Sequence, residues 1–227
     1  MSAAPPDGVA LLTLDRPPVN AFDAATFRAY AERLQALAAD PAVRVVVLTG
    51  AGERAFHAGA DTGKMLDPAA VEDELAGALT WFETLSDFPK PLVGALNGPA
   101  AGGGAAIAAD CDVLVAVPTA TISIPELSLG VVGGGSHIKR LAPTYFKAQR
   151  MMLLGEKLTA QEALAAGILA AIVEREELLP TAFELAARIA ALPPEAVQTA
   201  RAIFRRGEHE AVLPGYRSEL DAIIELG

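Results

Sequence analysis

Residues 90–112, KPLVGALNGPAAGGGAAIAADCD, decide how this chain folds. The apolar run at 91–96 has the length of a strand, and Asn97-Gly98-Pro99 then supplies residues typical of a turn. Three glycines, at 102–104, open an alanine-rich run of high helix propensity that has almost no polar face. The stretch therefore predicts a strand, a turn and a short buried helix.

The glycines at the helix start also predict a binding site. Glycine permits close approach of a ligand to the backbone, and the first turn of a helix has N–H groups without intrahelical partners at the positive end of its dipole. An alternative is that the glycines only let the helix pack closely on a strand. A dinucleotide motif would need glycine in place of Ile107, and no Lys-Ser/Thr pair follows, so a nucleotide site is disfavoured.

Length and composition predict one domain. The chain has 227 residues, of which 52% are hydrophobic. We expect a core domain at 1–190 followed by a C-terminal helical segment at 191–227. Because there is no apolar run of about 18 residues and no signal-peptide pattern, we expect a cytoplasmic protein without a membrane partner.

Charge and cysteine content exclude further classes. Eighteen Lys and Arg stand against 28 Asp and Glu, a net charge of −10, without a basic block, so nucleic acid is not an expected partner. Cys111 is the only cysteine, so no internal disulfide can form, and we expect it to be a buried small hydrophobe. No spacing of histidines and carboxylates indicates a metal site.

The rest of the chain alternates strands with helices or turns. Strands are expected at 8–14, 43–48, 91–96, 113–117, 121–124 and 170–173. Helices are expected at 24–39, 68–86, after Gly102, at 136–141 and from a capped start at Thr159. This order predicts an α/β fold with a helical C-terminal third.

Three segments in this order resemble the crotonase (enoyl-CoA hydratase/isomerase) superfamily. They are 56–61 (FHAGAD), 90–112, and 124–127 (IPEL) with Gly130 and Arg140-Leu141. The resemblance covers about Val9 to Arg188. It implies a spiral of ββα units with a helical C-terminal region, an acyl-CoA thioester substrate, no cofactor beyond the coenzyme A of that substrate, and a homotrimer or hexamer.

The resemblance also implies site residues. The backbone N–H groups of Ala60 and Gly103 would form an oxyanion hole for an enolate, and Glu126 would be the acid–base group. Ala58, whose backbone would contact the adenine, is one of four residues expected to bind the substrate. The other three are Gly59, Asp61 and Gly102.

The chain departs from the family at two positions. Ala106 stands where the hydratases have a second glutamate, and His137 where the family typically has glycine. His137 is therefore a possible site residue, and so is Lys64, either as a ligand of the coenzyme A phosphates or as a solvated charge. For His57 a surface or supporting role is expected.

Two hypotheses follow. The first is an enzyme of the isomerase/hydratase type with Glu126 as its single acid–base group. The second is a catalytically impaired relative that binds acyl-CoA or acts as a scaffold, which Ala106 favours. A hydrolase built on Ser136 ranks last, because the Gly-x-Ser-x-Gly pattern is absent.

Overall fold

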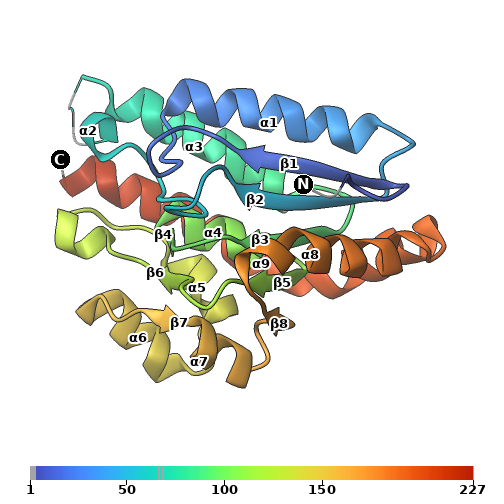
Figure 1. The fold of residues 1–227 in the computed structure, drawn as a ribbon. Coiled ribbons are helices and arrows are strands. Elements are labelled where there is room, and N and C mark those ends of the chain that lie inside the picture. Colours follow the sequence, from blue (N-terminus) through green and yellow to red (C-terminus); the bar gives the residue numbers. More distant parts are fainter. Residues whose placement is uncertain (1–3, 66, 68, 227) are drawn as a thin grey trace.

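The computed structural model describes residues 4–65, 67 and 69–226, and for 207–213 and 223–226 it describes the backbone only. A parallel sheet forms the centre of the molecule (Figure 1). Its strands, in spatial order, are β1 (Val9–Leu14), β2 (Val45–Gly50), β3 (Leu92–Leu96), β5 (Val113–Ala116) and β8 (Ala171–Ile172). Every residue of β2 and β3 is buried, as continuous apolar runs in a parallel sheet require. The expected α/β class is confirmed.

A second, smaller sheet positions the start of the glycine-opened helix. It consists of β4 (Ala100–Ala101), β6 (Thr121–Ser123) and β7 (Leu158–Thr159), with β4 parallel and β7 antiparallel to β6. Strand β4 was not expected from the sequence, because two alanines carry no strand pattern. It leads directly into α4 (Gly103–Asp110), all of which is buried except its first residue.

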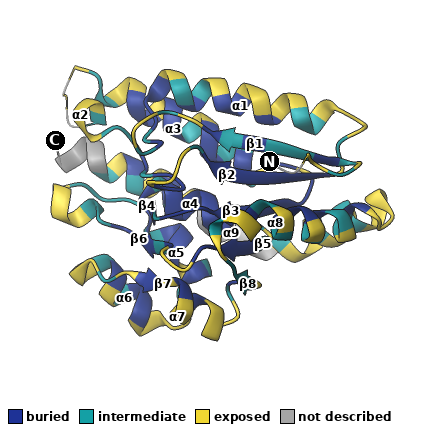
Figure 2. Ribbon diagram, viewed as in Figure 1, coloured by how far each residue is buried: buried dark blue, intermediate teal, exposed yellow. Residues whose placement is uncertain are grey.

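Helices cover the large sheet. Helix α1 (Ala24–Ala39) packs on α3 (Val71–Ser86), and Gly77 makes this possible, since a Cβ there would lie 2.6 Å from the Cα of Ala24. Helix α8 (Arg175–Ala190) packs across β2, β3 and β5. Helix α1 is buried on one side and exposed on the other (Figure 2). Leu66 and Pro68, in the region where α3 was expected to start, lie outside the described residues, and α3 starts at Val71.

The remaining elements follow in chain order. They are α2 (Thr62–Met65), the 3₁₀ helix η1 (Glu126–Leu129), α5 (Gly135–Leu141), α6 (Tyr145–Leu154), α7 (Ala160–Ala165) and α9 (Pro194–Leu226). Helix α7 starts at the expected capping box of Thr159 and Glu162. None of the described helices is long and apolar enough to cross a membrane.

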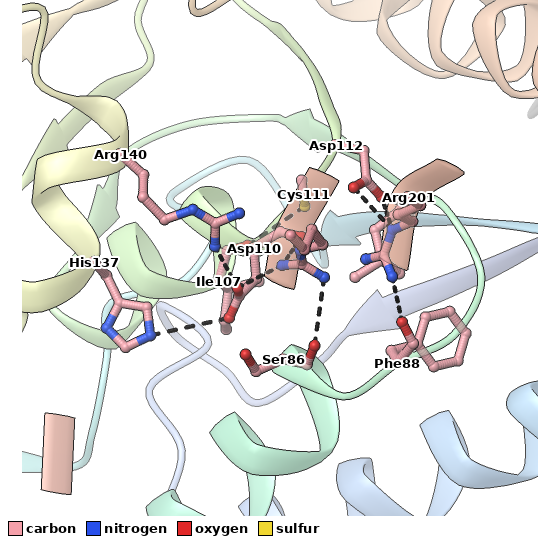
Figure 3. Close-up of polar contacts among 11 residues, drawn as sticks. Ser86, Phe88, Ile107, Asp110, Cys111, Asp112, His137, Arg140 and Arg201 are labelled. Carbon is pink, nitrogen blue, oxygen red and sulfur yellow. Dashed lines mark hydrogen bonds and ion pairs between the residues drawn. The ribbon is translucent and has the colours of Figure 1, made fainter. Parts of the chain in front are cut away.

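A buried polar cluster fastens α9 to the end of α4 (Figure 3). The Asp110 side chain is fully buried, and its Oδ1 accepts hydrogen bonds from Arg140 (2.6 Å) and Arg205 (2.8 Å). Next to it, both oxygens of Asp112 accept from Nε of Arg201, at 2.9 and 2.8 Å. Cys111, between the two aspartates, is partly buried, and burial raises the pKa of its thiol.

We predict that Asp110→Ala destabilises the fold strongly, because it leaves the mostly buried guanidinium groups of Arg140 and Arg205 without their carboxylate. Breaking a buried ion pair from one side costs about 3–5 kcal/mol of unfolding free energy. Urea denaturation measures this loss, with Asp221→Ala, an exposed position of α9, as the control. Equal losses in the two variants would contradict the role of Asp110.

Candidate active site

Two glycine-containing segments meet at the centre of the site. A Cβ on Gly59 would lie 3.0 Å from the nitrogen of Gly103, and a Cβ on Gly103 would lie 3.3 Å from the Cα of Gly59. Gly59 also has φ +91°, which L side chains rarely adopt. The loop at 56–61 and the start of α4 can therefore touch only because both positions are glycine.

This contact presents two free backbone donors. The N–H groups of Ala60 and Gly103 have no hydrogen-bond partner among the described residues, whereas the N–H groups of Ala58, Gly59 and Asp61 all do. Ala60 and Gly103 line the same pocket, together with Ala58, Gly59 and Gly102. The pocket therefore has a pair of unpaired N–H groups of the kind that an oxyanion hole requires.

His57 supports the first of these segments. It is fully buried, so the expected surface role is wrong, and the supporting role agrees with its contacts. Its Nδ1 accepts a hydrogen bond from the N–H of Gly59 (2.9 Å), and its ring packs edge-on against Phe22. Burial lowers the pKa of His57 to about 3, so the ring stays neutral and keeps Nδ1 as an acceptor.

Glu126, the first residue of η1, lies against a wall of glycines. A Cβ on Gly102 would be 2.9 Å from its Oε1, and a Cβ on Gly134 would be 3.4 Å from the same atom. Its Oε2 is buried and has no hydrogen-bond partner in the described part of the chain. Burial, with a smaller contribution from the nearby carboxylate of Glu219, raises the pKa of Glu126 to about 7.

The rest of the pocket wall is mostly apolar. Ala106 is part of it, so a longer side chain at this position would extend toward the space that Glu126 borders. Further apolar residues of the wall are Phe27, Met65, Leu75, Ala78, Phe82, Pro125, Leu129, Val131, Val132 and Leu220. Such a pocket excludes water and strengthens the electrostatic effect of the few polar groups that it contains.

The structure does not bring three of the expected residues into this wall. Asp61 accepts from Arg16 (2.9 Å), and Lys64 donates to Asp23 (2.7 Å), so both side chains are ion-paired outside the pocket. His137 is buried behind the wall, 4.0 Å from Oδ2 of Asp110 (Figure 3). No group of three His, Cys, Asp or Glu within the described residues could hold a metal ion.

Sequence reasoning missed the contribution of α9. Tyr216 and Leu220 line the pocket, and Glu219 accepts hydrogen bonds from the N–H and Oγ of Ser136, each at 2.7 Å. These residues lie about 90 positions after Glu126 in the chain, and only their i, i+3 and i+4 spacing indicates a shared helix face.

Within the described residues, this α/β fold holds an apolar pocket bordered by two backbone N–H groups without a partner and by the buried carboxylate of Glu126. A family model described as enoyl-CoA hydratase/isomerase matches residues 5–222, and the chain belongs to this crotonase family of enzymes. Membership implies an acyl-CoA substrate.

Two relatives illustrate the similarity. The chain is 36% identical over 211 residues to a carnitinyl-CoA dehydratase of Proteus mirabilis, covering 91% of this chain and 80% of the relative. Among solved structures, it resembles Pseudomonas aeruginosa OdaA with a TM-score of 0.86 and 30% identity, covering 96% of this chain and 90% of OdaA. An enoyl-CoA hydratase/isomerase of Mycobacterium paratuberculosis also has a TM-score of 0.86, at 27% identity, with 96% and 89% covered.

We predict that Glu126 makes the fold less stable as pH rises. Its pKa is about 7 in the folded protein against an ordinary value of 4.5, so between these values the folded state binds a proton that the unfolded state has released. Stability from this group is therefore lost as pH rises from 4.5 through about 7. Urea denaturation at about pH 5 and about pH 8 should show the wild type losing about 2–3 kcal/mol relative to Glu126→Gln. Parallel pH dependences in the two proteins would exclude a raised pKa for Glu126.

Proposed function

We propose that this enzyme transfers a proton at the carbon next to the thioester carbonyl of an acyl-CoA, with Glu126 as its single acid–base group. One observation carries the proposal. Glu126 has a carboxylate oxygen, and Ala60 and Gly103 have N–H groups, that no described residue hydrogen-bonds, and all three residues border the same apolar pocket. A base beside two donors is the arrangement that enolate formation needs.

The proposed reaction begins at the α-carbon. The carboxylate of Glu126 takes the α-proton, and the electron pair of the C–H bond moves into an enolate whose oxygen accepts from both N–H groups. Each such donor contributes about 2.7–4 kcal/mol to lowering the barrier. Glu126 then returns its proton to the α-carbon or to the γ-carbon, and return to the γ-carbon moves a double bond.

A pKa near 7 suits this role. The carboxylate is a stronger base than an ordinary glutamate and is still about half ionised at neutral pH. In the same pocket Ala106 offers no second carboxylate, so the addition of water lacks the partner that shares proton transfer in the hydratases. We therefore expect isomerisation or proton exchange to exceed hydration.

A second candidate function is elimination of a 3-hydroxyl group. It is favoured by the 36% identity to a carnitinyl-CoA dehydratase. It begins with the same proton transfer to Glu126 and differs in the bond that breaks afterwards. Only Ala106 favours the alternative of a catalytically impaired relative. The base Glu126 and the free N–H groups of Ala60 and Gly103 favour an enzyme.

We predict that Glu126→Gln lowers exchange of the α-proton of butyryl-CoA in deuterated water by about 10²–10⁴-fold, because it removes the base and keeps the shape. Mass spectrometry or NMR measures the exchange, and Glu177→Gln, an exposed glutamate of α8, is the matched control. The wild-type rate should rise with pH up to about 7 and then level off.

Wild-type exchange in Glu126→Gln would contradict the single-base mechanism. Hydration of crotonyl-CoA by the wild type as fast as exchange would contradict the expectation that isomerisation or proton exchange exceeds hydration.

We also propose a homotrimer or hexamer. Helix α6 exposes four large apolar side chains: Tyr145 (67%), Phe146 (74%), Leu153 (61%) and Leu154 (72%). Leu127 and Leu129 of the neighbouring η1 are each 43% exposed. A cluster of exposed apolar side chains is typical of a subunit interface.

We predict that sedimentation equilibrium at micromolar concentration finds a trimer or hexamer. Phe146→Asp should shift the protein toward the monomer, because it places a charge in the apolar patch. Leu192→Asp, which alters an exposed leucine on another part of the surface, should not do so. A wild-type monomer, or assembly that survives Phe146→Asp, would count against this interface.

A further inference from the structure

Helix α9 is held against the pocket in a fixed register. A Cβ on Gly215 would lie 2.4 Å from Oγ of Ser136, so the helix backbone lies directly on the start of α5. One turn later, Oε1 of Glu219 accepts from both the N–H and the Oγ of Ser136. Tyr216 and Leu220, spaced i and i+4 on this helix, consequently line the pocket.

Tyr216 carries a hydroxyl group that forms no hydrogen bond within the described part of the chain. The residue is 7% exposed, and its hydroxyl makes no hydrogen bond to any described residue. By contrast, the hydroxyl of Tyr30 donates to the carbonyl of Thr13 and accepts from the N–H of Asp15, and Tyr145 is 67% exposed. Because Tyr216 lines the pocket, a ligand that fills the pocket can accept a hydrogen bond from this hydroxyl group.

Aromatic contacts hold the Tyr216 ring in place. It packs edge-on against Phe82, with ring centroids 5.1 Å apart, and edge-on against His137, at 5.2 Å. Phe82 in turn reaches the oxyanion segment, since a Cβ on Gly103 would lie 3.3 Å from its Cζ. Tyr216 is therefore separated from the oxyanion donors by one aromatic ring.

The charge state of this phenol limits what it can do. Burial and the carboxylates of Glu219 and Glu126 raise the pKa of Tyr216, so it keeps its proton at neutral pH. It can donate a hydrogen bond and is a poor base. A neutral donor of this kind complements Glu126, which supplies the negative charge of the same pocket.

We propose that Tyr216 is a substrate-binding catalytic residue that donates a hydrogen bond to an oxygen on carbon 3 of the acyl chain. This proposal rests on the second candidate function, elimination of a 3-hydroxyl group, and assigns a residue of this chain to the leaving oxygen. The carbonyl oxygen is held by Ala60 and Gly103, so the phenol meets atoms farther along the acyl chain. It provides the polar contact that Ala106 cannot provide in the same pocket.

Elimination of water from a 3-hydroxyacyl-CoA needs only one base, Glu126. Glu126 takes the proton from carbon 2, and the electron pair of that bond forms the enolate. The double bond between carbons 2 and 3 then forms as the bond from carbon 3 to oxygen breaks, and the proton held by Glu126 joins the departing hydroxide to give water. Tyr216 keeps its own proton throughout and stabilises the oxygen as negative charge develops on it.

The test compares the binding of two ligands that differ by one hydroxyl group. In the Glu126→Gln background, which strongly slows turnover, isothermal titration gives the dissociation constants of 3-hydroxybutyryl-CoA and butyryl-CoA. We expect the hydroxylated ligand to bind about 10-fold more tightly. Adding Tyr216→Phe should abolish this preference, whereas adding Tyr145→Phe, at an exposed tyrosine, should keep it.

The outcomes separate this proposal from the proposed function. No preference for the hydroxylated ligand, a preference that survives Tyr216→Phe, or equal weakening of both ligands by Tyr216→Phe would each overturn the role of Tyr216. The last outcome would assign the residue to packing alone. Failure of the wild type to exchange the α-proton of butyryl-CoA would instead overturn the proposed proton transfer, and the binding preference is measured independently of it.

Discussion

The backbone at Gly59 touches the backbone at Gly103 with no space for a side chain between them, and the arrangement of the site depends on this contact. If either residue had a Cβ, the two segments would separate by several tenths of an ångström, and Ala60 and Gly103 would no longer present their N–H groups to one pocket. The structure reinforces the contact from one side through His57. A Cβ on Gly104 would lie only 2.0 Å from the carbonyl oxygen of His57, so the start of α4 packs directly against the backbone of His57.

Two buried carboxylates of the fold, those of Glu126 and Asp110, have opposite surroundings. Oε2 of Glu126 has no hydrogen-bond partner in the described chain, which destabilises the ionised form. The Asp110 cluster is the opposite case, because Arg140 and Arg205 saturate one oxygen of its carboxylate and lock α9 in place. One buried acid is thus committed to holding the helices together, and the other is left free to react.

How far the sequence predicts the molecule depends on the range of the interactions involved. The central strands and the glycine-opened helix could be predicted because short apolar runs, turn residues and glycines are local signals. Ala60, Gly103 and Glu126 were expected from a resemblance in three ordered segments, and the structure brings them to one pocket. Strand β4 could not be predicted, because its two alanines form a strand only by pairing with Ile122 and Ser123.

The C-terminal part of the site was hidden for a related reason. Nothing in the sequence near Tyr216 indicates a ligand, since its position follows from the contact of Gly215 with Ser136, 79 residues earlier.

A phenol at the position of Tyr216 suits the charge balance of the pocket. A second carboxylate beside Glu126 would raise the pKa of both acids and favour their protonated forms. A phenol adds a hydrogen-bond donor without adding charge. Because its raised pKa keeps the Tyr216 hydroxyl protonated, it does not act as a base in place of Glu126. In this pocket one group can therefore act as the base while the other remains a donor, and their difference in pKa keeps the two roles separate.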